Sequence, residues 1–473
     1  MAKGIACLAL LLLSGCTVDP EPDNPPPIIS KNFDGTESTA TSLPAASIDW
    51  KEYINDTELC GLIGRAFEKN RSLRVVALRV EEARAAYGII KADQTPTLNA
   101  GASGIRARIP GDLNGFGTAI TGNQFQLSVG ISSWEADFWG RIRNLNDAAL
   151  ENYLVSEDNR RAATLGLISQ ISKTYLNLRE LDERIGLAKQ TAESRKASLQ
   201  LFRRRVELGA TSKLELSQVE LLSLQAETLI SQLQQARAIE GHALNLLVGA
   251  PVTLVPLTAP LSYRNIFPEI ETGLPSALLI NRPDISAAEH ALKAAKANIK
   301  AARAAFFPRI ALTATAGTAS AELNGLFKDG SGAWNFSPSI SLPIFDGGRL
   351  QAALDVATIR REQSVAQYEQ VIQASFRDVA DALTTKQWLT EQARSIDATT
   401  SVLAERSRQA KLRYDSGAAR YLEVLDAERD LLSASQESVK VRHAILTNQI
   451  ALFIALGGGA HRLPDLLNTT PSN

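Results

Sequence analysis

An internal duplication constrains the fold of this 473-residue chain more than any other feature. The segment VELGATSKLELSQVELLSL at 206–224 aligns without gaps with YDSGAARYLEVLDAERDLL at 414–432, a displacement of 208 residues. The same displacement holds for the whole stretch from Gly140 to Gly249. A repeat of this length predicts one architectural unit that is built twice, rather than two unrelated domains.

Each copy begins with the same order of hydrophobic patterns. A helical pattern comes first, at about 59–93 and again at about 276–306, and each run stops shortly before a proline. Two stretches that alternate apolar with small polar residues follow, separated by a glycine-rich loop that holds Asn-Gly. Each copy is therefore predicted to carry one β-hairpin, which gives four strands in the chain. The predicted strands are TLNAGASG at 97–104, NQFQLSVGISSW at 123–134, RIALTATAG at 309–317 and WNFSPSISLP at 334–343.

The hydrophobic period changes to that of a helix after each hairpin. Between residues 178 and 206, apolar residues recur at alternating steps of three and four, with Arg195 at the one interrupted position. Such heptad spacing predicts a helix with a packed seam. No proline interrupts 141–208, so we expect a single helix of about 100 Å at 1.5 Å per residue.

Each long helix is expected to turn back at a glycine. A return helix over about 212–248 follows Gly209, and the second copy repeats this arrangement around Gly417. Glycine suits a helix end because it adopts positive φ without strain. The two turns, together with the first residues of each return helix, are thus the far ends of two long helical hairpins. We call them tip 1 (residues 205–221) and tip 2 (residues 413–429).

Composition excludes several classes of function. Lys and Arg number 50 against 51 Asp and Glu, so there is no basic excess for nucleic acid. The mean hydropathy of −0.07 is too low for a helical membrane protein. Three cysteines and four histidines lie scattered, and no common catalytic motif is present. We therefore expect no enzyme activity, no cofactor and no metal.

The N-terminus carries a targeting signal. Lys3 precedes a nine-residue apolar run, which is too short to cross a bilayer and typical of a secretory signal. The following LSGC resembles the lipoprotein cleavage box, which implies cleavage after Gly15 and lipid on Cys16. In lipoprotein signals an aspartate after the cysteine retains the protein at the inner membrane; Thr17 stands there and favours the outer membrane. An ordinary signal peptide with an incidental cysteine remains the alternative.

These observations divide the chain into six parts. The parts are a signal peptide at 1–15, a lipidated N-terminus with a proline-rich tether at 16–48, a first repeat at 49–250, a connector at 251–275, a second repeat at 276–460 and a C-terminal tail at 461–473.

The predicted pieces are incomplete in a single copy. In an outer membrane only a closed barrel satisfies every backbone group, and small barrels need about eight strands. Three chains would supply twelve strands and a ring of twelve helices. We therefore predict a homotrimer with a twelve-stranded outer-membrane barrel and a periplasmic helical tunnel. A four-stranded sheet in a soluble core alternates in the same way, so alternation alone leaves that fold open.

Together these features resemble the TolC-like outer-membrane efflux family, and within it the lipoprotein branch of OprM or NodT type. Besides LSGC, the matching segments are WKEYINDTELCGLIGRAFEKN at 50–70, WEADFWGR at 134–141, LPIFDGGR at 342–349 and YDSGAARYLEVLDAER at 414–429. The resemblance implies a passive duct that is anchored in the outer membrane and extends into the periplasm. It also implies a periplasmic adaptor and an inner-membrane pump, commonly of the resistance-nodulation-division type.

The resemblance further implies a periplasmic gate at tip 2. A leucine, an aspartate and an arginine line the constriction in the family, and the matching positions here are Leu422, Asp426 and Arg429. Three copies of Asp426 near an axis would form an anionic ring, which Arg429 could pair at i+3. A solvated surface pair is the alternative. The first copy has Gln218 and Leu221 at these places, so only the second copy would supply the gate.

Both tips, near Gly209 and Gly417, are implied to contact the adaptor. Two other functions stay open at this point: a duct of the same fold for type I protein secretion, and a non-channel lipoprotein adaptor with coiled-coil hairpins. Adaptors lack two spaced pairs of strands with polar inner faces. No motif identifies the exported compound.

Overall fold

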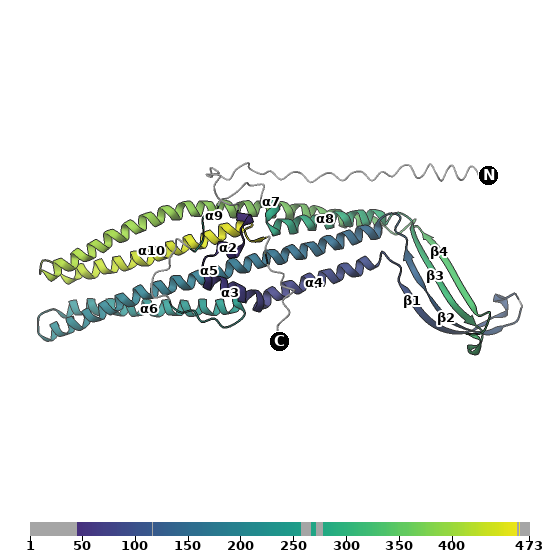
Figure 1. The fold of residues 1–473 in the computed structure, drawn as a ribbon, viewed down its shortest axis with the longest axis horizontal. Helices are drawn as coiled ribbons and strands as arrows, with labels where there is room; N and C mark the ends of the chain where they lie inside the picture. The colour runs from purple at the N-terminus through teal and green to yellow at the C-terminus, as the bar shows by residue number, and fades with distance from the viewer. Residues whose placement is uncertain (1–44, 116, 257–265, 271–277, 461–462, 464–473) are drawn as a thin grey trace. The chain divides into compact units, whose positions relative to one another are not determined.

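The computed structural model describes residues 45–115, 117–256, 266–270, 278–460 and 463. The predicted signal peptide, the tether with Cys16 and nearly all of the tail lie outside them. In the described part, two long helical hairpins run side by side, and one four-stranded sheet follows at the end remote from the tips (Figure 1).

The two halves of the chain contain the same elements in the same order. A short η1 (Ala45–Ser47) and α2 (Trp50–Tyr53) precede them. The first half comprises α3 (Thr57–Lys69), α4 (Arg71–Ala92), β1 (Leu98–Ile109), η2 (Gly111–Leu113), β2 (Ile120–Glu135), α5 (Arg141–Glu207) and α6 (Lys213–Val248). The second comprises α7 (Leu278–Asn281), α8 (Pro283–Ala304), β3 (Arg309–Ser320), η5 (Leu323–Gly325), β4 (Gly332–Ser341), α9 (Arg349–Asp415) and α10 (Tyr421–Ala455). The predicted duplication and mainly helical fold are confirmed.

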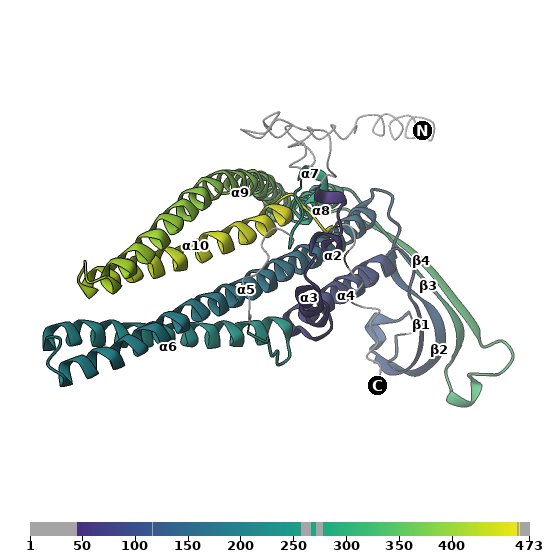
Figure 2. The same ribbon diagram turned by 60° about the vertical axis from the view of Figure 1, so that its left-hand side comes forward.

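The long helices bury the predicted heptad positions fully or in part, and near the end of α6 the buried positions shift by one residue. Both α5 and α9 have 67 residues, and each pairs with its return helix (Figure 2). Arg195 is buried among the apolar seam residues, as its heptad position predicts. On α6 a continued heptad seam would bury Ala243 and Leu247, but these are only half-buried, whereas Leu244 and Val248 are buried. The shift arises because a straight helix has 3.6 residues per turn rather than 3.5.

The first helical run of each half is broken, which corrects the prediction of one continuous helix over 59–93. Asn70 ends α3 and caps α4: its side chain accepts a hydrogen bond from the Leu73 amide at 2.7 Å and donates to the Leu247 carbonyl at 2.6 Å. Asparagine is a strong N-cap residue, so this break had a local signal. In the second half, α8 likewise starts afresh at Pro283, where proline fits the first turn.

Each return helix ends on a glycine that packs against the break in its own half. Gly249 and Gly457 both have positive φ. A Cβ on Gly249 would lie 2.3 Å from the Lys69 carbonyl oxygen, and one on Gly457 would lie 2.8 Å from that of Asn281. These close approaches join the end of each repeat to its beginning. The largest apolar core surrounds them and includes Trp50, Tyr53, Leu62, Ile168, Tyr175, Val248, Phe267, Ile450 and Phe453.

The four strands form one antiparallel sheet in the order β1-β2-β3-β4, because β2 pairs with β3 and joins the two hairpins. The register separates an apolar from a polar face over most of the sheet; near the loop of the first hairpin the polarity reverses, with Arg106 and Arg108 on the apolar side and Ile105, Ile109 and Ile120 on the polar side. The apolar face holds Leu98, Ala100, Ala102, Phe125, Leu127, Val129, Ile131, Ile310, Leu312, Ala314, Ala316, Trp334, Phe336 and Ile340. The polar face holds Asn99, Ser103, Gln124, Gln126, Ser128, Thr313, Thr315, Asn335, Ser337, Ser339 and Ser341.

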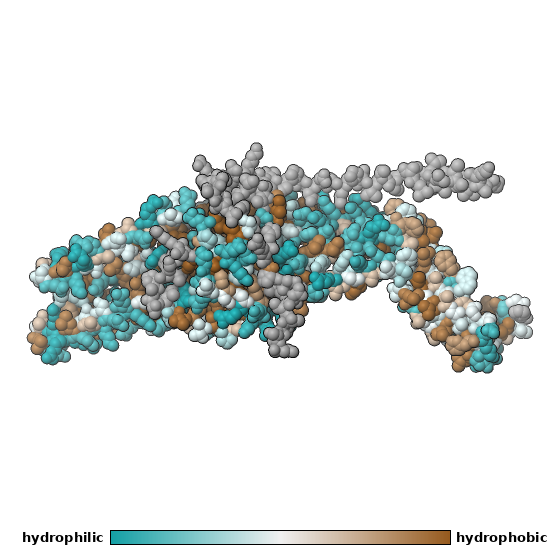
Figure 3. Space-filling view, viewed as in Figure 1, coloured by the Kyte–Doolittle hydropathy of each residue, from teal (hydrophilic) through white to brown (hydrophobic). Residues whose placement is uncertain are grey.

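The sheet is unfinished within this chain. The outer edges of β1 and β4 pair with no strand among the described residues. Residues along the whole of β1 are exposed. In Figure 3 the sheet shows mostly brown and white residues, whereas hydrophilic teal is more frequent over the helices.

Candidate functional site

The two tips use the same turn. Gly209 has φ +69° and Gly417 has φ +77°. In both tips the glycine amide donates to the carbonyl three residues back, at 3.0 and 2.9 Å, and the next amide donates to the carbonyl five residues back, at 2.8 Å. This double bond pattern is the Schellman motif, which satisfies the free carbonyls at a helix end. Both predicted tip glycines therefore lie at the turn that ends a long helix.

The return helices begin differently after these turns. At tip 1 the Ser212 side chain caps α6 by accepting a hydrogen bond from the Glu215 amide at 3.2 Å. At tip 2 the equivalent Arg420 makes no capping side-chain bond. Instead Arg413, at the end of α9, forms an ion pair with Glu423 of α10 at 3.0 Å. Tip 1 is thus closed by a cap, and tip 2 by a charge pair between its helices.

The predicted gate residues gather on one face of α10. Leu422, Asp426 and Arg429 follow each other at steps of four and three, so they project from the same side of the helix. An Arg429 nitrogen lies 3.2 Å from an Asp426 oxygen. The side chain of Asp426 is 40 % exposed and that of Arg429 56 % exposed. Nothing in the described chain buries this face.

An aromatic cluster joins the two hairpins beside the tips. It consists of Phe202 on α5, Tyr414 on α9 and Tyr421 on α10, with ring centroids 4.6 and 4.8 Å apart. The Tyr421 hydroxyl donates to the Ser198 hydroxyl at 2.6 Å. The Arg205 guanidinium donates to the Tyr414 hydroxyl. Tip 2 is therefore held to the first hairpin by hydrogen bonds as well as by apolar contact.

Arg195, a buried charged residue, precedes Phe202 of this cluster on α5. Arg195 is 4 % exposed, and it donates to the Leu222 carbonyl at 2.8 Å. Burial lowers the pKa of Arg195, and the Glu428 carboxylate on α10 opposes that shift. Burial likewise raises the pKa of Glu428, against the attraction of Arg195. The two charges attract each other between α5 and α10, but burial has the larger influence on the pKa of each group.

The contact between α5 and α10 remains polar farther from the tips. Arg184 donates to the Gln436 side chain at 2.7 Å, and Gln436 donates back to the Arg184 carbonyl at 3.0 Å. Inside the first hairpin Ile185 and Leu233 belong to one apolar cluster, and Arg237 on α6 pairs with Asp182 on α5. Polar and apolar contacts therefore occur both within the first hairpin and between the two hairpins.

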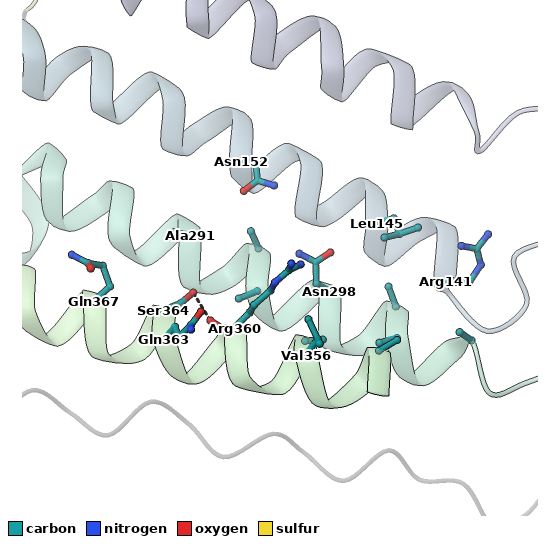
Figure 4. A pocket seen from close by; sticks show the side chains of 17 residues that line it. Arg141, Leu145, Asn152, Ala291, Asn298, Val356, Arg360, Gln363, Ser364 and Gln367 are labelled. Carbon is teal, nitrogen blue, oxygen red and sulfur yellow. Dashed lines mark hydrogen bonds between the residues drawn. The ribbon is translucent and has the colours of Figure 1, made fainter. Parts of the chain in front are cut away.

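A groove of about 750 Å³ runs between α5, α8 and α9 nearer the sheet. Alanines form much of its lining, and Figure 4 shows Asn152, Asn298, Arg360, Gln363 and Gln367 around it. Its lining includes no carboxylate, thiol or imidazole among the described residues. Such a surface offers polar contacts from amides, the Ser364 hydroxyl and two guanidinium groups, set among alanines.

The described ranges contain no group of three His, Cys, Asp or Glu side chains arranged to hold a metal ion. Within the same ranges, no helix has the length and hydropathy needed to cross a bilayer.

A duplicated chain with two long helical hairpins and an unfinished sheet of one apolar and one polar face defines a subunit of an outer-membrane export channel. A model of the outer membrane efflux protein family matches residues 62–250 and again residues 274–458. The chain belongs to this family, which confirms the efflux role and the outer-membrane location predicted from the sequence.

Named relatives match almost end to end. The chain is 38 % identical over 471 residues to the solvent efflux pump outer membrane protein SrpC of Pseudomonas putida, covering 97 % of this chain and 98 % of the relative. It is 39 % identical over 467 residues to the outer membrane protein OprJ of Pseudomonas aeruginosa, covering 97 % and 96 %.

Solved structures match as closely. A membrane protein of Pseudomonas aeruginosa superposes with a TM-score of 0.89 at 37 % identity, covering 96 % of this chain and 100 % of the other. The open state of the MtrE outer membrane channel of Neisseria gonorrhoeae gives 0.85 at 35 % identity, covering 94 % and 99 %.

Sequence reasoning missed the aromatic cluster. A signal for it was present in the repeat itself: Tyr414 and Tyr421 stand where the first copy has Val206 and Lys213. A pair of tyrosines that one copy gained on both sides of the same turn indicates a contact specific to that tip. The predicted lipid on Cys16 lies outside the described residues and stays a prediction, as do the roles of the gate residues.

Proposed function

We propose that three copies of this chain form the outer-membrane duct of a tripartite efflux system. The observation that carries this proposal is the sheet, which has one apolar face, one polar face and two edges that no strand of the described residues pairs with. Pairing β4 of each copy with β1 of the next closes a twelve-stranded barrel and removes every edge. The apolar face then contacts lipid, and the polar face lines a lumen.

The helices support the same assembly. Large apolar side chains on α6 and α9 are exposed in the single chain, although α5 and α10 cover the opposite sides of these helices. They include Leu221, Leu224, Ile239 and Leu246 on α6 and Trp388, Val402 and Leu412 on α9. Neighbouring copies that bury these side chains would continue the row of helices into a periplasmic tunnel.

The cargo is proposed from the relatives and from the groove. Relatives are named for the efflux of solvents, toluene and antibiotics. We propose small toxic compounds as cargo here, which the names favour over type I protein secretion. End-to-end likeness to channels argues against a non-channel adaptor. The duct itself does no chemistry, and an inner-membrane pump, commonly of the resistance-nodulation-division type, drives export through an adaptor that contacts both tips.

The gate belongs to tip 2 in this proposal. Leu422 and Arg429 are exposed and Asp426 is half-buried, and the three lie on one face of α10, as a constriction built by three copies requires. Arg429 pairs with Asp426 within the chain, so the ring is partly neutralised in the closed arrangement. A lipid on Cys16 would add an anchor to the outer membrane.

Reconstitution tests the duct directly. Detergent-extracted protein should sediment as a trimer and produce discrete conductance steps in a planar bilayer. A monodisperse single subunit, or a trimer that never conducts, would contradict the proposal. Accumulation of an antibiotic in cells that lack the gene, together with unchanged secretion of proteins, separates small-molecule efflux from type I secretion.

A further inference from the structure

The first hairpin of the sheet changes polarity near its loop. On β1 the apolar face runs from Leu98 through Ala102, and Arg106 and Arg108 continue that same face at the next even positions. The register with β2 is unbroken along all of β1, so no bulge turns these arginines to the other side. Two positive charges therefore stand at the loop end of a face that is apolar on β1 from Leu98 through Ala102.

The cross-strand pair that precedes the arginines on this face contains an aromatic residue. Gly104 pairs with Phe125, and a Cβ on Gly104 would lie 3.3 Å from the Phe125 ring. The ring thus lies across the strand on the apolar face. Aromatic side chains typically mark the ends of the lipid-facing band of a barrel.

The dimensions of the strand place the arginines at the outer edge of that band. Arg106 is eight residues and Arg108 ten residues beyond Leu98, where β1 begins just after α4. At about 3.3 Å per residue and a tilt of about 40°, these positions stand about 20 and 25 Å above Leu98. The lipid-facing band of such barrels is about 25 Å tall. Long arginine side chains at this level reach the headgroups.

The surroundings of the arginines suit an anion. Both side chains are exposed, and no ion pair from the described residues reaches either guanidinium. Their cross-strand neighbours are Asn123 and Thr121, which add uncharged hydrogen-bonding groups beside them. Guanidinium groups bind phosphate in a bidentate manner.

From this arrangement we propose that Arg106 and Arg108, with Asn123 and Thr121, bind phosphate groups of the lipid in the outer leaflet. The inference rests on the proposed barrel, because only that assembly directs the apolar face toward lipid. The corresponding end of the second hairpin carries no arginine on this face: β3 ends in Thr318 and Ser320 there. Each chain therefore supplies one such site, and a trimer three.

Thermal unfolding in the presence of defined lipids tests the site. Diphosphoryl lipid A added to the detergent-solubilised trimer should raise its midpoint, and a zwitterionic phosphatidylcholine should not. Arg106→Gln and Arg108→Gln should each weaken the apparent affinity for lipid A about fivefold, and the double variant about thirtyfold. Lys328→Gln serves as the matched control, because Lys328 is an exposed cation in the loop between β3 and β4.

Three outcomes would overturn the site: a double variant that binds lipid A as tightly as the parent, a Lys328→Gln variant that loses binding equally, or inorganic phosphate that reproduces the full shift. Single-channel conductance distinguishes a failure of the lipid site from a failure of the proposed duct. The double variant should keep the parent's single-channel conductance. If it instead changed ion selectivity while lipid A bound normally, the arginines would face the lumen; the duct would stand and the lipid site would fail.

Discussion

Tip 1 and tip 2 share a turn but differ in the side-chain contacts that follow it. Both end a 67-residue helix with a positive-φ glycine and the same two backbone bonds. Tip 1 is then finished by its own cap at Ser212, whereas tip 2 depends on the Arg413–Glu423 pair and on hydrogen bonds to the first hairpin. Duplication preserved the part that a helix end requires and left the side chains free to diverge.

The two tips have the same backbone turn, but the difference in their side-chain contacts suits them to different roles. A return helix that begins with a side-chain cap, as α6 does at Ser212, needs no bond to another hairpin to hold its first turn. A tip that is held by bonds to another hairpin can change position when those bonds break, because each contributes only about 1 kcal/mol. Tip 2 is therefore the one suited to move, and it is also the one that carries Asp426.

The largest expected effect is at Asp426. Asp426→Ala removes the proposed anionic ring and the partner of Arg429, so we expect passive conductance and antibiotic leakage to rise several-fold. Gln218→Ala, the equivalent change in the first copy, should leave both unchanged. Single-channel recording measures the first quantity, and drug susceptibility the second. Equal conductance of the Asp426→Ala variant and the parent would remove the gate from this position.

The second effect concerns the bond that holds tip 2. Tyr421→Phe deletes the hydroxyl that donates to Ser198 and keeps the ring in the aromatic cluster. The lost bond should cost about 1 kcal/mol of the attachment of tip 2 and raise the frequency of opening, by less than Asp426→Ala does.

Ser198→Ala should have the same effect, and the double variant should add little to either single change. Fully additive effects in this cycle would show that the two hydroxyls act separately. Their bond would then not be what restrains the tip.

The helices, strands and turns could be predicted from the sequence because local residue patterns determine them. The alternation of apolar and polar residues predicted the strands, the heptad spacing around Arg195 predicted the long helix, and two glycines predicted the turns. The spacing of Leu422, Asp426 and Arg429 also predicts that they share one helix face, whereas their role as a gate was implied by the family resemblance and stays a prediction. These features depend on neighbours within about one helical turn or one strand.

The rest depended on contacts between distant segments. The Tyr421–Ser198 bond joins residues 223 positions apart, and no periodicity encodes it. The pairing of β2 with β3, which merges two hairpins into one sheet, is equally non-local. The break at Asn70 is different, because its capping signal was local and was outweighed by the long apolar pattern around it.

A third effect should appear at tip 1. Ser212→Ala removes the cap of α6 and should destabilise the start of that helix by about 1 kcal/mol. Arg420→Ala, at the equivalent place in tip 2, removes no capping bond and should have a much smaller effect. Amide hydrogen exchange over the first turn of α6 and of α10 reports the two helices separately. Equal acceleration in both would contradict the division between a self-closed tip and a tethered one.

The smallest effect concerns the buried Glu428. Burial raises its pKa in the folded protein, so the folded state binds a proton more readily than the unfolded chain. Lowering the pH through that raised pKa therefore removes a destabilising charge, and the contact between α5 and α10 should tighten. Glu428→Gln should protect the tip amides at neutral pH and make no difference below the ordinary pKa of a glutamate.

Glu220, the equivalent residue of the first copy, is the control for this comparison. It is exposed and paired with Arg203 at 3.0 Å, so Glu220→Gln should not reproduce the protection. Should Glu428→Gln instead loosen tip 2 at neutral pH, the attraction between Glu428 and Arg195 must outweigh the cost of burying the carboxylate. The charged pair would then be a tether of tip 2, stronger than its burial indicates.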